Sequence, residues 1–157
     1  TQDHRSAEQY RRVIEQFSVE TEPRYARTEK DTWCTIFSWD VTSAMGCEIP
    51  HWIDASGRPA PVGRGVELNA NATFDWLAEY GHGHGWSKCD ILAAEQRAGV
   101  GCPTVAAYRN PKGRGHIAIV TPTGPGLHIA QAGANNYADV PIARGFGAAQ
   151  FTLFTHA

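Results

Sequence analysis

The chain has 157 residues, of which 42% are hydrophobic and 19% are charged, a composition typical of a globular protein. Its 14 basic and 16 acidic residues give a formal net charge of −2, which argues against nucleic acid as a partner because proteins that bind it carry a strongly basic surface. No apolar stretch reaches the ~18–20 residues that a membrane-spanning helix needs. Thr1 is not preceded by a signal-like apolar run, so we interpret the chain as a mature form or as a domain excised from a longer protein.

The first third of the chain predicts two helices. In residues 4–18, four apolar side chains recur at helical spacing, namely Tyr10, Val13, Ile14 and Phe17. A second helix is predicted over residues 33–45, with Asp31 or Thr32 as its N-cap and Gly46 after its end. Its apolar positions predict that this helix is substantially buried: Ile36, Phe37, Val41, Ala44 and Met45.

The middle of the chain alternates irregular and helical segments. Residues 47–70 are rich in proline and glycine and predict a long loop, and long loops inside compact domains usually have a function. Asn71 is expected to cap a short helix over residues 72–81. The HGHGW segment at 82–86 predicts a turn, and residues 90–99 predict a further short helix.

The second half of the chain changes to β-rich runs separated by turn-forming segments. Strands are predicted at four places, within residues 103–109, 115–122, 127–133 and 148–156. Their short connections indicate an antiparallel sheet. Because the helices come first and the strands follow, the sequence predicts an α+β fold.

The four cysteines show neither a dense disulfide framework nor the close pairs of a zinc knuckle. One disulfide bond among Cys47, Cys89 and Cys102 stays an alternative. Cys89–Cys102 is the first choice because both cysteines flank one predicted helix. Cys34 differs from the others because it falls in the first turn of the second helix. Unpaired N–H groups at that position carry partial positive charge and are expected to lower the pKa of the thiol.

A reactive cysteine also needs a histidine to take its proton. Among the seven histidines, His116 stands out because it follows the turn KGRG and opens the apolar strand IAIV. In the next strand, alternation places His128 on one face and Gln131 on the other, where its amide points at His116 and orients the imidazole. The residues alone therefore predict a site formed by Cys34, His116 and Gln131.

This ordered set resembles the papain-like cell-wall cysteine peptidases and amidases, the NlpC/P60 and CHAP group. DTWCTIFSWDV is similar to the nucleophile helix of that group, GRGHIAIVTP to its base strand and LHIAQAG to the strand of its third residue. The resemblance implies a papain-like fold in which the nucleophile helix packs on a C-terminal antiparallel sheet. It assigns Cys34 as nucleophile, His116 as general base and Gln131 as orienting residue, with Asn135 as the substitute for Gln131.

The resemblance also implies the remaining parts of the site and the reaction. Tyr25 and the Cys34 backbone N–H would form the oxyanion site, and Trp33 would contact the substrate, in a single catalytic domain spanning residues 1–157. The substrate would be the peptidoglycan stem peptide, cut without a cofactor at a D-γ-glutamyl–diamino-acid bond or a nearby amide. Further aromatic side chains could line a groove, namely Trp52, Trp86 and Tyr137. The protein would be secreted, in the cell wall or on a virion, fused to or delivered by a larger assembly.

The chain departs from the family pattern, and two alternatives stay open. It has Trp-Cys-Thr-Ile where NlpC/P60 members usually have Asp-Cys-Ser-Gly, and a glutamine where the third residue is often His, Glu or Asn. A zinc-dependent hydrolase would use His51, His82 and His84, with Asp54 in the preceding loop. A non-catalytic cell-wall-binding domain is the second alternative.

Overall fold

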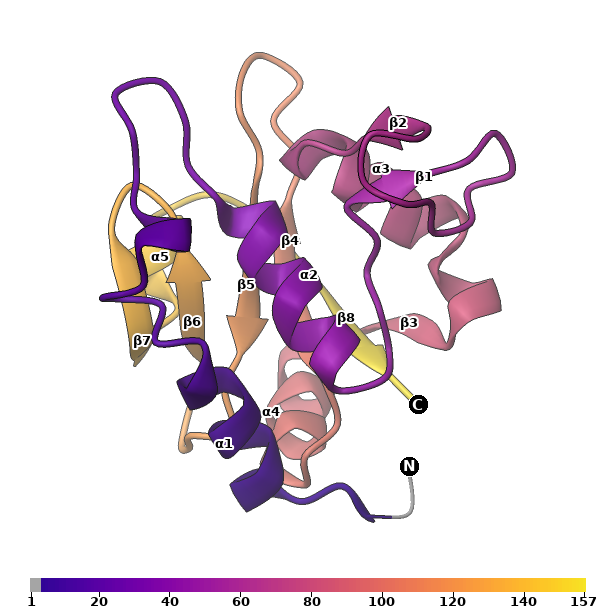
Figure 1. Cartoon of the computed structure of the whole chain (residues 1–157). Helices are drawn as coiled ribbons and strands as arrows, with labels where there is room; N and C mark the ends of the chain where they lie inside the picture. The colour runs from indigo at the N-terminus through magenta and orange to yellow at the C-terminus, as the bar shows by residue number, and fades with distance from the viewer. Residues whose placement is uncertain (1–3) are drawn as a thin grey trace.

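The structure is a computed structural model that describes residues 4–157. Within these residues, five α-helices accompany a six-stranded antiparallel sheet, and α2 lies across one face of that sheet (Figure 1). The predicted α+β class is confirmed, and the helix that carries Cys34 packs on a sheet built mainly from the second half of the chain.

Four of the five α-helices lie close to their predicted positions, but the last one was not predicted and two predicted caps are wrong. The helices are α1 (Ala7–Gln16), α2 (Cys34–Ala44), α3 (Ala70–Glu79), α4 (Ile91–Gly99) and α5 (Ala143–Phe146), with 3-10 turns η2 (Pro23–Tyr25) and η3 (Gly81–His84). The N-cap of α2 is Trp33, whose side chain makes no capping bond, instead of Asp31 or Thr32. The N-cap of α3 is Asn69, which accepts a hydrogen bond from the backbone N–H of Ala72, instead of Asn71.

The main sheet contains the four predicted strands and two that the sequence pattern did not indicate. The strands are β1 (Trp52–Ile53), β2 (Val66–Glu67), β3 (Trp86–Cys89), β4 (Thr104–Tyr108), β5 (His116–Val120), β6 (His128–Ala132), β7 (Asn136–Pro141) and β8 (Thr152–His156). The order in the main sheet is β3-β8-β4-β5-β6-β7, so the unpredicted β3 and β7 are its two edges. Strands β1 and β2 pair with each other inside the segment that was predicted to be a long loop.

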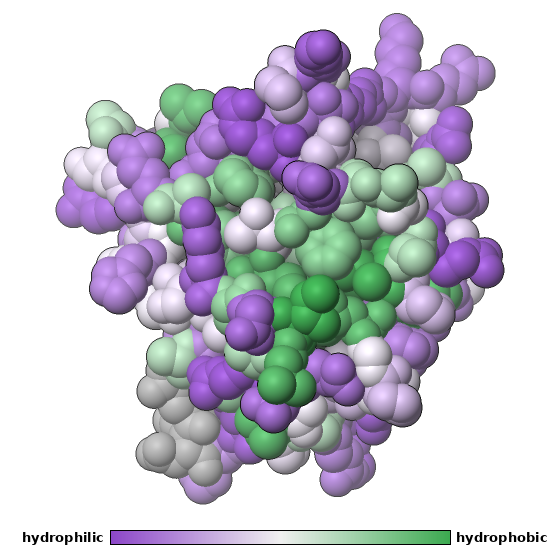
Figure 2. All heavy atoms as spheres, turned by 180° about the vertical axis from the view of Figure 1, so that it is seen from behind, coloured by the Kyte–Doolittle hydropathy of each residue, from purple (hydrophilic) through white to green (hydrophobic). Residues whose placement is uncertain are grey.

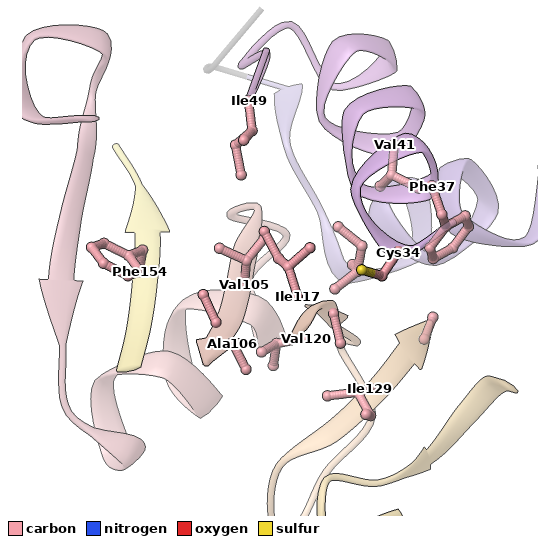
Figure 3. Packing of buried hydrophobic residues seen from close by; sticks show 14 of the residues in the cluster. Cys34, Phe37, Val41, Ile49, Val105, Ala106, Ile117, Val120, Ile129 and Phe154 are labelled. Carbon is pink, nitrogen blue, oxygen red and sulfur yellow. The ribbon is translucent and has the colours of Figure 1, made fainter. Parts of the chain in front are cut away.

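The core lies between α2 and the sheet. One face of α2 is buried, and its members recur at the three- and four-residue spacing of a helix: Cys34, Phe37, Ser38, Val41 and Thr42. This face packs on β5 and β6, with Cys34 beside Ile117 (Figure 3). Ala44 was expected to be buried but is exposed because it lies off this stripe. The first residue of α2 is thereby held directly over β5.

The opposite side of the molecule carries a contiguous hydrophobic area bordered by hydrophilic side chains (Figure 2). On the surface of α4, the side chains of Ile91 and Leu92 are 58% and 64% exposed. Within residues 4–157, no helix combines the length and the hydropathy needed to cross a bilayer.

Candidate active site

Cys34 is the first residue of α2 and is 5% exposed. The turn before it is fixed by Trp33, whose indole N–H donates to the carbonyl of Ala26 at 2.8 Å. Because Trp33 provides no side-chain cap, the first N–H groups of α2 stay available near the cysteine. The sequence therefore placed Cys34 correctly at the start of the helix.

Burial has a larger effect on the pKa of the Cys34 thiol than the N–H groups at the helix end have. Burial raises the pKa of this thiol, and the backbone N–H groups of Ile117, Thr35 and Cys34 itself oppose the shift without cancelling it. The sequence-based expectation of a lowered pKa is therefore wrong for this structure. The reason is the sheet: the sulfur lies against β5, beside the backbone of Ile117 (Figure 3).

His116 and Gln131 meet as the strand alternation predicted. The Nε2 atom of His116 lies 2.7 Å from Oε1 of Gln131, and the Gln131 side chain is buried. The amide nitrogen of Gln131 donates to the carbonyl of Asn135 at 2.9 Å, which fixes its oxygen toward the imidazole. Nε2 then carries the ring hydrogen, and Nδ1 remains as the basic nitrogen. Asn135 thus supports Gln131 through its backbone, and its own side chain is exposed.

Helix α5 covers this imidazole. The ring of Phe146 lies 4.9 Å from the ring of His116, centroid to centroid, and Phe146 in turn contacts Phe151. Burial lowers the pKa of His116, and the hydrogen bond that its Nε2 donates to Gln131 opposes that shift. No sequence pattern indicated this contact, because the four-residue helix α5 falls in a segment predicted to be a loop.

The Cys34 sulfur lies at the backbone of the residue next to His116, but it forms no hydrogen bond with the imidazole. Cys34 faces the amide of Ile117, which is the next residue after His116 on β5. Among the hydrogen bonds of residues 4–157, none joins Cys34 to His116, and His116 has Gln131 as its side-chain partner. With the pKa of the thiol raised and that of the imidazole lowered, both groups are neutral near neutral pH.

A cleft of about 410 Å³ opens beside Cys34. Its walls come from four segments: residues 31–36, His51, residues 67–71 and residues 113–115. Trp33 lies in this wall, as expected. The other aromatic side chains predicted for a groove do not line this cleft. Trp52 packs edge-on against His51, Trp86 packs against His156, and Tyr137 forms a cation–π contact with Arg144.

Asn71 has a role in this cleft that the sequence did not indicate. Its amide nitrogen donates to the carbonyls of Asn110 and Gly113, at 2.9 and 3.0 Å, and its oxygen accepts from the N–H of Asn110. These bonds hold the β4–β5 loop, which leads directly into His116. A Cβ atom at Gly115 would lie 2.5 Å from the Asn71 oxygen, so this approach requires glycine.

Tyr25 contacts Phe37 and Asp40 of α2 and is 1% exposed. Its hydroxyl donates to a carboxylate oxygen of Asp40 at 2.6 Å, and Arg24 binds the same carboxylate. The Tyr25 ring also packs edge-on against Phe37 at 5.3 Å. A contribution of Tyr25 to an oxyanion site would require its hydroxyl to exchange this hydrogen bond for one to the substrate.

The described residues do not assemble the alternative zinc site. His51 pairs with Glu67 at 2.9 Å, His84 packs on Trp76, and His82 is exposed. Across residues 4–157, no group of three or more His, Cys, Asp or Glu side chains is placed to hold a metal ion. All four cysteines are free thiols, so the Cys89–Cys102 bridge considered from the sequence is not formed.

No protein-family model matches this chain, and no curated protein matches it. The functional interpretation therefore depends on the residues of the site and on their geometry.

Proposed function

We propose that this chain is a cysteine hydrolase with the papain-like fold of the NlpC/P60 and CHAP group, and that it cuts an amide bond in the peptidoglycan stem peptide. The observation that carries the proposal is the hydrogen bond of 2.7 Å between His116 Nε2 and Gln131 Oε1. His116 begins β5, and the backbone N–H of the next residue, Ile117, contacts the Cys34 sulfur. A buried glutamine that fixes the orientation of an imidazole has a direct use in acyl transfer, where the imidazole serves a thiol nucleophile as its base.

The reaction couples attack by the Cys34 sulfur to transfer of the Cys34 proton to Nδ1 of His116. The sulfur attacks the amide carbon, and the negative charge on the tetrahedral oxygen is stabilised by N–H groups at the start of α2. His116 then gives its proton to the leaving amine, the C–N bond breaks, and a thioester remains on Cys34. Water hydrolyses the thioester with His116 again as the base, which restores the free thiol.

The resting site is a neutral pair, so the proton transfer occurs during attack rather than before it. Burial disfavours both the thiolate and the imidazolium in the empty site. Cys34 lines the cleft and His116 does not, so the substrate first reaches the sulfur. In the reacting arrangement, the sulfur exchanges its contact with the Ile117 amide for one with Nδ1 of His116.

The D-γ-glutamyl–diamino-acid bond, or a neighbouring amide, is the bond proposed through the resemblance. An enzyme with this substrate acts where peptidoglycan is exposed, so we place the protein outside the cytoplasm, in the wall or on a virion. Fusion to a larger protein or delivery by an assembly would bring it there.

Digestion of purified peptidoglycan tests this function. We expect the fragment masses to show one hydrolysed amide in the stem peptide and an intact glycan chain, with the same products in the presence of a chelator. Products cut in the glycan chain, or a reaction that stops on chelation and returns with zinc, would contradict the proposal.

Gly145 provides a test of how Gln131 is held. A Cβ atom at this position would overlap Oε1 of Gln131 and lie 2.5 Å from Cδ1 of Ile129, so we expect Gly145→Ala to displace the amide from His116. Hydrolysis should fall roughly 10- to 100-fold because the imidazole loses its orientation. Overpacking should also lower the free energy of unfolding by about 1–3 kcal/mol.

Gly83→Ala is the matched control, because a Cβ atom there meets nothing within 4 Å. Peptidoglycan hydrolysis and thermal unfolding are measured for both variants. A Gly145→Ala protein with the activity of the wild type would show that the Gln131 contact is not needed.

A further inference from the structure

The β6–β7 turn, residues 133–135, lies against the imidazole and its glutamine. The carbonyl of Asn135 accepts the hydrogen bond from Nε2 of Gln131 at 2.9 Å, and a carbonyl can only accept. A Cβ atom at Gly133 would lie 2.9 Å from the same nitrogen and 3.2 Å from Cε1 of His116. The position of this turn therefore determines that the amide presents its oxygen, and not its nitrogen, to His116.

Asn136, the first residue of β7, supports this turn with its side chain. Its Oδ1 accepts from the N–H of Gly133 at 3.1 Å, which closes the turn. Its Nδ2 donates to the carbonyls of Val19 and Tyr25, at 3.0 and 2.7 Å. Both polar atoms of this half-buried amide thus bind backbone groups, one in the turn and two in the segment between α1 and α2.

The segment that Asn136 binds is itself fixed to the helix of the nucleophile. The Tyr25 hydroxyl donates to Asp40 of α2 at 2.6 Å, and the Tyr25 ring packs on Phe37 of the same helix. Asn136 therefore connects the turn that orients the base with a segment packed on the helix that carries Cys34.

Two further hydrogen bonds join the same parts of the chain, and both are longer and exposed. The guanidinium of Arg27 donates to the carbonyl of Ala134 at 3.4 Å. The N–H of Ala138 donates to the carboxylate of Glu20 at 3.3 Å. Exposed hydrogen bonds of this length contribute little, because water competes for both groups. The shorter, half-buried bonds of Asn136 are therefore the main connection.

We propose that Asn136 is a positioning residue for the base: it holds the β6–β7 turn in place, and the turn keeps the oxygen of Gln131 aimed at His116. This inference rests on the proposed function. Asn136 is not part of the wall of the cleft beside Cys34, so it acts through Gln131 and His116 and not through the substrate.

The expected consequence of losing Asn136 follows from the hydrogen-bonding groups of the amide. If the turn shifts, the amide nitrogen of Gln131 loses its acceptor, and the amide can rotate to present that nitrogen to Nε2 of His116. Nε2 would then accept a hydrogen bond, and the ring hydrogen would be on Nδ1. The proposed reaction needs Nδ1 as the acceptor of the Cys34 proton, so this tautomer is inactive as a base.

Two variants test the inference on soluble peptidoglycan fragments. Asn136→Ala removes all three hydrogen bonds of the side chain. Asn136→Asp keeps the size and the acceptor for the Gly133 N–H, but it places a carboxylate oxygen against two carbonyls. We expect both variants to lower kcat roughly 10- to 100-fold, with KM changed less than about threefold because the residue lies outside the cleft.

Asp90→Ala is the control for a loss of stability away from the site. Asp90 caps α4 by accepting from the N–H of Ala93 at 2.8 Å. Its replacement should lower the unfolding temperature by a few degrees and leave kcat within about twofold of wild type. An Asn136 variant that loses no more activity than Asp90→Ala would overturn the inference.

The ring hydrogen of His116 gives a readout that does not depend on activity. Because Nε2 donates to Gln131, NMR of the isotope-labelled wild type should show a slowly exchanging N–H signal at Nε2. We expect this signal to be lost, or to move to Nδ1, in both Asn136 variants and to persist in Asp90→Ala. That result would support the inference even if the wild type hydrolysed no peptidoglycan, which would contradict only the proposed function. An unchanged Nε2 signal in folded Asn136→Ala would overturn the inference.

Discussion

Replacing Cys34 by alanine should abolish hydrolysis of peptidoglycan. The variant loses the only nucleophile in the proposed reaction, so we expect the rate to fall at least about 10⁴-fold, to the limit set by the background. The fold should persist, because alanine is a good helix former and the change removes one buried sulfur atom from α2. The measurement is release of soluble wall fragments, with circular dichroism to verify the fold.

Cys89→Ala is the control for this variant, because Cys89 is a half-buried free thiol on the edge strand β3. It should retain the activity of the wild type. A Cys34→Ala protein that still degrades walls at the wild-type rate would place the nucleophile elsewhere and refute the mechanism.

Replacing His116 by glutamine should lower hydrolysis by about 10²–10⁴-fold, the usual contribution of a general base. The pH profile gives a second readout. The imidazole acts as a base only when neutral, and burial lowers its pKa from the ordinary value of 6.5, so wild-type activity should hold down to a pH below 6.5 and then fall as the imidazole is protonated. The residual activity of His116→Gln should lack this acidic limb.

His82→Gln is the matched control, because His82 is exposed in η3 and lies outside the cleft. It should preserve both the rate and the acidic limb. If the limb were unchanged in His116→Gln, the titrating base would have to be another residue.

The central part of the fold could be predicted because its residues have strong local patterns. The apolar positions of α2 recur at helical spacing, and β5 and β6 consist mainly of small and branched apolar residues. The edges of the sheet could not be predicted in the same way. β3 and β7 are rich in polar or partly exposed residues, and an edge strand needs no second apolar face.

The helix caps show why local propensity alone was not sufficient. Both Asn69 and Asn71 are good N-cap residues, and sequence favours neither of them strongly. Asn69 caps α3, while tertiary packing uses the Asn71 amide to hold the β4–β5 loop. The distinction depends on residues 39 positions away, which no local pattern contains.

The candidate site was predictable where it depended on alternation and not where it depended on burial. Alternation along β6 is sufficient to aim Gln131 at His116. The direction of the pKa shift at Cys34 depends instead on how closely the helix end packs on β5, and the helix position alone indicated the opposite sign. The cover of Phe146 over His116 and the pairing of His51 with Glu67 also arise only in the folded chain.

Alkylation of Cys34 tests the central claim most directly. Iodoacetamide is applied at alkaline pH, because burial raises the pKa of the thiol, and peptide mass analysis separates modification of Cys34 from that of the other three free cysteines. We predict that hydrolysis of peptidoglycan is lost in proportion to modification of Cys34 and not of Cys47, Cys89 or Cys102. Full modification of Cys34 with undiminished hydrolysis would contradict the account.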